Sequence, residues 1–307
     1  MSDWHKLGRI WAPDGALNWA KYGFMTPVPV AMGDGRIRLF GGLRDGDGIS
    51  RIGWIDVLEL DPLQVVATCG EPALDIGAPG MFDDNGCILG DVIRLPNGDF
   101  RMYYVGFQLP QKAKFMAFTG VAESRDGTTF ERVFPTPVLD RAPGALFINA
   151  LHSIVPMGDG YRAWISCGRG WETIDRQDYP RYDCWSVDSD DGLFFDMRTA
   201  RRIVTPDETE YRIGRPRANR IGTGYELRVT SDTFSKQYAS YRFTSTDGAE
   251  WQRCPDIELP RGEPGAWDHE MTCYPAFYSG EDADYLFYNG NGMGQTGVGV
   301  ARRERRK

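Results

Sequence analysis

The sequence predicts an all-β protein, a five-bladed β-propeller of four-stranded antiparallel blades. Three observations predict it: tight-turn signals recur along the chain, apolar segments of strand length flank them, and helical periodicity is nearly absent. A repeat of several tens of residues that contains four strands is typical of propeller blades. Because propellers of 307 residues can fold as one unit, we expect a single domain over residues 1–307.

One series of turns follows the first strand of each repeat. In "PVPVAMGDGRIRLFGG" (27–42), for example, an apolar strand runs through a Gly-rich turn into another apolar strand. Five units result, and they start near residues 23, 82, 147, 212 and 267. Their turns are GDGR (33–36), PNGD (96–99), GDGY (158–161), GTGY (222–225) and GEDADY (280–285). The segment 142–157 could also be read as helical, but the register of the repeat favours a strand in its second half.

A second series of turns shares the pattern Ser-x-Asp-Gly-x-x-aromatic. Its copies are "SRDGTTF" (124–130), "SDDGLFF" (189–195) and "STDGAEW" (245–251). Asp-Gly between apolar runs is typical of a type I′ hairpin turn, which needs positive φ at both central positions. We expect each copy to join the third and fourth strands of a blade.

Composition argues against several classes of function. A net charge of −8 and a pI near 5.1 disfavour a nucleic-acid partner. The N-terminal segment lacks the apolar region of a secretory signal, and no apolar run approaches the roughly 20 residues of a membrane span, so we expect a cytoplasmic protein. Six scattered cysteines without a CxxC pair, together with only three histidines, predict neither a metal site nor a cofactor.

Antiparallel strand order places the two kinds of turn on one face and the longer connections on the other. The longer connections are richer in polar and aromatic residues, which is where rigid scaffolds usually carry function. We expect them to gather acidic, amide, basic and aromatic side chains in a central funnel. Such a set suits a polyhydroxylated ligand, and paired acids are what glycoside chemistry requires.

Several segments resemble a known group of proteins. "GMFDDNGCILGDVI" (80–93), "GRP" (214–216) and above all "WDHEMTCYPAFY" (267–278) with "YLFYNGNGMGQTGVGVA" (285–301) resemble glycosidase-like five-bladed propellers. These are related to glycoside hydrolase families 43, 32 and 130, and the bacterial group is often associated with surface-polysaccharide genes. The segment "RIRLFGGLRDGDGISRIGWIDV" (36–57) is similar to the corresponding part of that group and of mannoside phosphorylases.

The resemblance covers nearly the whole chain and implies a set of site residues. It points to Arg44, Asp45, Ser50, Arg51, Asp83, Asn85, Arg215, Asp268, Glu270, Asn289 and Asn291. The acidic triad typical of family 43 does not transfer. Its three positions hold Lys21/Tyr22, Asn149/His152 and Arg212/Arg215.

The leading hypothesis is a carbohydrate-active enzyme that cleaves or transfers a glycosyl unit. Its catalytic candidates are Asp268, Glu270 and Asp83. Its substrate-binding candidates are Arg44, Asp45, Asp84, Asn85, His152, Arg215, Trp267, His269, Asn289 and Asn291. The arginines favour a small carbohydrate or sugar-phosphate ligand with an anionic group. The alternative is a non-catalytic sugar-binding or assembly protein that has kept the fold and lost the triad, and the oligomeric state stays open.

Overall fold

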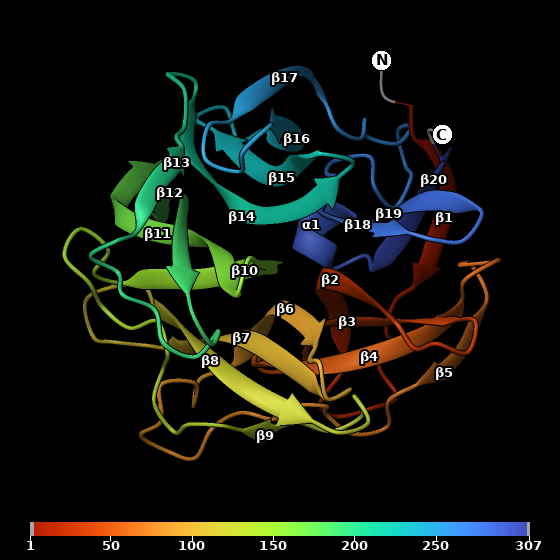
Figure 1. The fold of residues 1–307 in the computed structure, drawn as a ribbon, viewed down its shortest axis with the longest axis horizontal. Helices are drawn as coiled ribbons and strands as arrows, with labels where there is room; N and C mark the ends of the chain where they lie inside the picture. Colours follow the sequence, from red (N-terminus) through yellow and green to blue (C-terminus); the bar gives the residue numbers. More distant parts are fainter. Residues whose placement is uncertain (1–2, 306–307) are drawn as a thin grey trace.

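The computed structural model describes residues 3–305, which are almost entirely β (Figure 1). This confirms the predicted all-β class. The sheets lie around the middle of the molecule, and their strands pair almost throughout in antiparallel fashion. Within this part of the chain, no helix has the length and apolar character needed to cross a bilayer.

The strands between residues 3 and 305 form four sheets. The first contains β2 (Tyr22–Ala31), β3 (Arg36–Arg44), β4 (Ser50–Leu58) and β5 (Val65–Thr68). The second contains β6 (Cys87–Arg94), β7 (Phe100–Gln108), β8 (Met116–Ser124), β9 (Glu131–Arg132), β10 (Ile148–Met157), β11 (Gly160–Ile174), β12 (Gln177–Ser189) and β13 (Arg201–Val204). The third contains β14 (Glu210–Ile221), β15 (Gly224–Thr233), β16 (Tyr238–Ser245) and β17 (Gln252–Ile257).

The last sheet joins the two ends of the chain. It contains β18 (Cys273–Ser279), β19 (Ala283–Asn289) and β20 (Val298–Glu304), and β1 (His5–Trp11) pairs with β20 at its edge. The strand β1 was not predicted from the sequence. The four-residue α1 (Asn291–Gly294) lies between β19 and β20, and left-handed φ at Gly292 and Met293 makes it a pair of tight turns.

The eight-stranded sheet consists of two antiparallel halves. β6–β9 form one half and β10–β13 the other, and only a two-residue parallel pairing between β8 and β10 joins them. The five expected hairpins are present, since β2–β3, β6–β7, β10–β11, β14–β15 and β18–β19 pair around the predicted turns. The second half of 142–157 is a strand, as predicted.

The Ser-x-Asp-Gly turns lie where they were predicted, but the turn type was wrong. Among their central residues only Gly127, Gly192 and Gly248 have positive φ, near 70°. The serine hydroxyl instead accepts a hydrogen bond from the glycine N–H, and the aspartate accepts one from the N–H two residues further on. Arg38 and Arg101 donate to carbonyl groups of two of these turns, which ties neighbouring parts of the fold together.

The first strands of the five repeats surround a common central axis. β2 contacts β6, β6 contacts β10, β10 contacts β14, β14 contacts β18, and β18 contacts β2. Each of these strands has a register shift at the same level. The shifts fall at Thr26-Pro27, Gly90, His152, Arg215-Pro216 and Tyr274-Pro275. A bulge bends the strand and re-aims a side chain. Here Thr26, His152, Arg215 and Tyr274 line a common space together with the backbone at Gly90.

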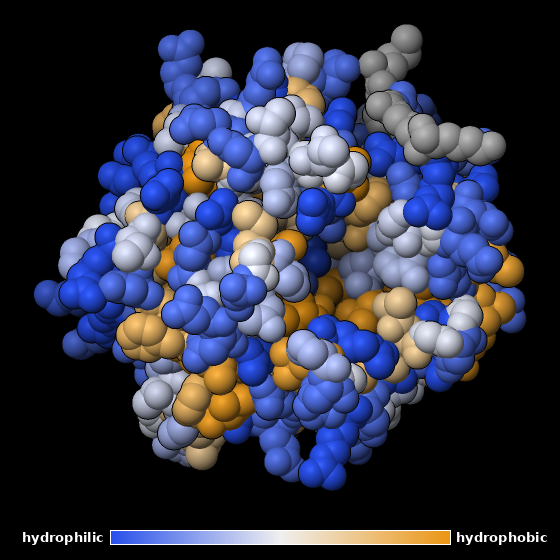
Figure 2. Space-filling view, in the orientation of Figure 1, coloured by the Kyte–Doolittle hydropathy of each residue, from blue (hydrophilic) through white to orange (hydrophobic). Residues whose placement is uncertain are grey.

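Hydrophobic residues between the sheets form the core, for example Phe40, Ile52, Leu89, Met102 and Phe118. Figure 2 shows a hollow near the middle of one face, with hydrophobic side chains visible inside it and hydrophilic ones over most of the surrounding surface. The fold therefore combines a packed scaffold with an open centre.

Candidate functional site

A cavity of about 300 Å³ lies where the inner strands converge. Much of its wall is apolar or aromatic, and cations and tyrosines supply the polar groups. The lining consists of Met25, Arg44, Ile88, Val105, Phe107, Lys114, Phe115, Ala117, Ile148, Ala150, His152, Ser166, Tyr179, Pro180, Tyr182, Arg212, Arg215, Tyr238, Tyr274 and Met293. Within residues 3–305, this lining contains no carboxylate and no side-chain amide.

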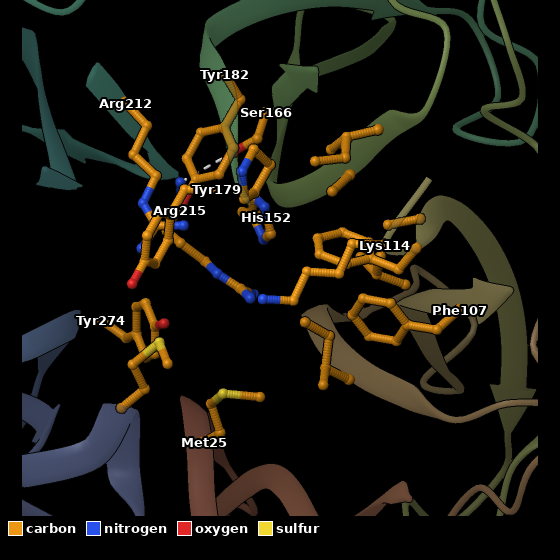
Figure 3. A pocket seen from close by; sticks show the side chains of 18 of the residues that line it. Met25, Phe107, Lys114, His152, Ser166, Tyr179, Tyr182, Arg212, Arg215 and Tyr274 are labelled. Carbon is orange, nitrogen blue, oxygen red and sulfur yellow. Dashed lines mark hydrogen bonds between the residues drawn. The ribbon is translucent and has the colours of Figure 1, made fainter. Parts of the chain in front are cut away.

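Three of the cations come from three different parts of the fold: Arg44 from β3, Lys114 from the loop between β7 and β8, and Arg215 from β14. None of them forms an ion pair with a carboxylate in the part of the chain that the structure describes. Figure 3 shows Lys114 and Arg215 reaching toward the middle of the cavity from opposite sides. Because unpaired like charges repel one another, this arrangement favours an anion between them.

Arg215 is held in an unusual backbone conformation. Its φ is +57°, although it is not glycine and it precedes Pro216. Its N–H donates to Ser166 Oγ at 3.0 Å, its guanidinium lies 4.9 Å from the Tyr274 ring centre, and its buried Nη1 has no partner among residues 3–305. Strained backbone is often found at functional sites, and here it directs a free donor toward the axis.

The fourth cation of the cavity, Arg212, is neutralised. Arg212 Nη2 donates to Asp232 at 2.7 Å, and Lys236 Nζ donates to the same carboxylate at 2.8 Å and to the Tyr211 hydroxyl at 2.5 Å. The Tyr179 ring, which comes from β12, lies 3.8 Å from Lys236 Nζ. This network holds the wall of the cavity in place, and Tyr179 packs against the ammonium group of Lys236.

His152 lines the cavity from the bulge of β10. Burial, reinforced by the positive charges of Arg215 and Arg217, lowers the pKa of His152 well below its usual range. Burial also raises the pKa of Tyr274 to about 12, so this phenol keeps its proton at neutral pH. The site therefore combines a neutral imidazole, which has one acceptor nitrogen, with hydrogen-bond donors.

We expect His152 to make the protein less stable in mild acid. Its folded pKa is depressed, so the unfolded chain takes up a proton as the pH falls below about 6.5 while the folded chain does not. The free energy of unfolding should then fall by up to about 1.4 kcal/mol per pH unit. Chemical denaturation at pH 7.5 and pH 5.5 should show this loss in the wild type and a smaller one in His152→Gln. Replacing the exposed His5 by Gln is the matched control, and an equal loss in all three proteins would contradict the expectation.

The structure brings three of the predicted site residues into the cavity, namely Arg44, His152 and Arg215. The predicted convergence of acids on the funnel needs correction. Asp268 is buried, and it accepts hydrogen bonds from Lys6 Nζ at 2.6 Å and from the Tyr288 hydroxyl at 3.0 Å. It therefore closes the last sheet against β1 and does not line the cavity.

The other two catalytic candidates are also outside the cavity lining. Asp83 is fully buried, and one of its oxygens accepts two hydrogen bonds from Arg132, at 2.9 and 2.5 Å. The Glu270 side chain is 65% exposed, and its carboxylate lies 3.6 Å from His269 Nε2. No two of these three acids therefore face each other across the cavity.

The remaining binding candidates support the backbone or pack in the interior. Asn289 hydrogen-bonds to Thr26, Phe24 and Gly297, while Asn291 accepts from the N–H groups of residues 270 and 271. The other candidates also lie outside the cavity lining. Asp45 pairs with Arg51, Asp84 accepts a hydrogen bond from the Gly80 N–H, and Asn85 accepts one from the Leu109 N–H. His269 Nδ1 contacts the carbonyl of Ala266, Trp267 packs on Tyr288, and Ser50 is buried.

Comparison with known proteins then gives the family. No family model matches the chain. Uncharacterized protein Rv1502 of Mycobacterium tuberculosis (strain ATCC 25618 / H37Rv) is 32% identical over 304 residues, which cover 97% of this chain and 98% of that protein. The chain belongs to the Rv1502 family.

Solved structures show which fold this chain shares with other proteins. The protein BT0996, solved as an RGII complex, has a TM-score of 0.73 at 16% identity, and the match covers 99% of this chain and 92% of BT0996. A structure from the GH130 family of mannoside phosphorylases has a TM-score of 0.73 at 14% identity and covers 99% and 94%. That family contains glycoside hydrolases that target β-1,2 mannosidic linkages in Candida mannan. The fold is therefore that of the glycosidase-like propellers, as the resemblance implied.

Sequence reasoning missed most of the residues that line the cavity in this member of the Rv1502 family. Lys114 and Tyr179 lie in connections that were expected to carry function, but neither was singled out. One signal was available: Thr26, Arg215 and Tyr274 each precede a proline in the first strand of a repeat, and proline in a sheet often marks a bulge. No group of three or more possible metal-ligating side chains occurs between residues 3 and 305.

Proposed function

We propose that the central cavity binds the anionic group of a sugar derivative, such as a sugar phosphate or an acidic glycan. The observation that carries this proposal is the convergence of Arg44, Lys114 and Arg215 without a carboxylate to neutralise them. Guanidinium groups bind phosphate and carboxylate through paired hydrogen bonds, and lysine adds a point charge. A glycosidase-like fold supports a carbohydrate as the rest of the ligand.

The distribution of carboxylates favours binding over two-carboxylate hydrolysis. Glycoside hydrolases of that kind need an acid and a base or nucleophile about 5–10 Å apart on the two sides of the bond. Here Asp83 and Asp268 are engaged by Arg132 and Lys6, and Glu270 lies away from the cavity. The non-catalytic alternative therefore becomes the leading proposal.

A transfer reaction is the second candidate, and the neutral His152 favours it. The imidazole lines the same cavity as the three cations and stays unprotonated at neutral pH. When an acceptor hydroxyl attacks the anomeric carbon of a glycosyl phosphate, a neutral histidine can accept the hydroxyl proton while the C–O bond to the phosphate breaks and the phosphate leaves into the cationic site. This chemistry requires no carboxylate pair.

The proposal also includes the architecture that holds the site. We count each half of the eight-stranded sheet as one blade, so that residues 1–307 form a single five-bladed propeller of four-stranded blades. The closed contacts among β2, β6, β10, β14 and β18 support this count. A cytoplasmic location with access to soluble sugar phosphates is part of the same proposal.

Isothermal titration calorimetry with matched ligands tests the binding proposal. We expect glucose 6-phosphate to bind at least about tenfold more tightly than glucose, because charge-assisted hydrogen bonds are strong. The affinity should fall as salt is raised from 20 to 300 mM, since screening weakens the attraction. The variant Glu270→Gln should bind as the wild type does.

Equal affinity for the charged and neutral ligands would contradict the binding proposal, as would a large loss in Glu270→Gln. Glucose 1-phosphate, incubated with and without a glucose acceptor, separates the two candidate functions, because transfer of its glucosyl unit would release phosphate. Product release that His152→Gln abolishes would favour transfer, and binding without turnover would favour the non-catalytic role.

A further inference from the structure

We infer that an aromatic surface beside the cavity, formed by Phe107, Phe115, Phe147 and Trp171, binds a second sugar ring of the same ligand. The inference rests on the proposed function and specifies its ligand as a phosphorylated disaccharide or a longer anionic glycan. The charged ring would occupy the cavity. The next ring would place its C–H face on the aromatic surface.

The four rings form one continuous chain of contacts. Phe107 and Phe115 lie edge to face with centres 5.6 Å apart, and Phe115 and Trp171 do so at 5.7 Å. Phe147 and Trp171 are stacked at 4.9 Å with an angle of 21° between their planes. Phe107 and Phe115 also line the cavity, so the aromatic surface begins where the anion site ends.

The cationic site and the aromatic surface are adjacent in the chain as well as in space. Lys114 immediately precedes Phe115, and Figure 3 shows Lys114 and Phe107 on the same side of the cavity. The part of a bound ligand that extends out of the cavity past Lys114 would therefore contact these rings. Apolar ring faces cover the C–H side of a sugar, while the sugar hydroxyls stay in water or bind polar groups.

Trp171 is placed for such contact by the long β11–β12 hairpin. It follows a register shift between Gly168 and Gly170 and pairs with Pro180, which lines the cavity. The side chain is half-buried, and no residue between 3 and 305 accepts a hydrogen bond from its indole N–H. Because this N–H has no partner in that part of the chain and is not buried, it remains available to a ligand hydroxyl.

Comparing glucose 6-phosphate with trehalose 6-phosphate tests this inference, because the two ligands share the charged ring. We expect the wild type to bind trehalose 6-phosphate roughly 3- to 10-fold more tightly. Trp171→Ala should lose this preference and keep its affinity for glucose 6-phosphate, whereas Trp171→Phe should retain most of the preference. Phe194→Ala, which removes a ring that is 75% exposed on a Ser-x-Asp-Gly turn, is the matched control.

An unchanged preference in Trp171→Ala would overturn the inference, and so would the absence of a preference in the wild type. Failure of both phosphates to bind would instead contradict the proposed function. In that case the binding of neutral trehalose is followed by tryptophan fluorescence. If trehalose quenches the fluorescence of the wild type but not that of Trp171→Ala, the aromatic subsite is supported. If trehalose leaves the fluorescence of the wild type unchanged, the inference is overturned.

Discussion

Replacing Arg215 by glutamine is expected to weaken the binding of glucose 6-phosphate by about 10- to 100-fold. Hydrogen bonds to charged groups contribute about 1.5–3 kcal/mol, and each 1.4 kcal/mol is a factor of ten in affinity. Arg215 has a buried nitrogen without a partner, faces Lys114 across the cavity and forms no ion pair within residues 3–305. Titration calorimetry of the two proteins measures the loss.

Two further variants make this result specific. Arg215→Lys should recover part of the affinity, because it keeps the charge and loses the planar fork. Arg220→Gln changes an exposed arginine of the same strand and should bind as the wild type does. The melting temperature of Arg215→Gln should stay close to that of the wild type, since no ion pair is broken. Unchanged affinity in this variant would remove Arg215 from the anion site.

Asp83→Ala is expected to cause the largest loss of stability, although Asp83 was predicted to be catalytic. Its carboxylate is fully buried and holds Arg132, whose guanidinium lies 5.6 Å from the Tyr104 ring centre. Removing one partner of a buried ion pair leaves the other charge uncompensated and costs about 3–5 kcal/mol. We expect the lower end of this range because 20% of the Arg132 side chain reaches solvent. The melting temperature should fall by roughly 5–10 °C.

Differential scanning calorimetry measures this effect, and Asp75→Ala is its matched control. Asp75 pairs with Arg51, but its side chain is 63% exposed, so its loss should change the free energy of unfolding by less than about 1 kcal/mol. Asp83→Ala should retain its affinity for glucose 6-phosphate below its melting temperature. A variant of normal stability that has lost binding would restore Asp83 to the site.

Local sequence was sufficient to predict most of the strands. The Gly-rich and Asp-Gly turns mark where the chain reverses, because the required backbone geometry depends on the turn residues themselves. The same reasoning failed for β1, whose seven residues are all partly or fully exposed and which pairs with the far end of the chain. It also assigned the wrong turn type to the Ser-x-Asp-Gly motif, because it did not consider that the serine and aspartate side chains hydrogen-bond the backbone.

The candidate site was predicted less well than the fold. Arg44, His152 and Arg215 were singled out and do line the cavity, but the acids that looked most catalytic do not. Asp268 lies 262 positions from Lys6 and Asp83 lies 49 positions from Arg132, so no local pattern could reveal that these partners engage them. A buried acid and a catalytic acid can look alike in a sequence, because the partner that distinguishes them comes from elsewhere in the chain.

The amino-acid sequence by itself determined the all-β class, the repeat and the positions of the turns, since apolar segments of strand length and turn chemistry act over a few residues. Only the tertiary structure decided which polar side chains share the axis. Bulges at Arg215 and His152 bring cations and a neutral imidazole together, while long-range ion pairs draw the acids away. The net charge around a binding site is the sum of the charges on all side chains that lie nearby in space. These side chains come together only when the sheets pack around the centre.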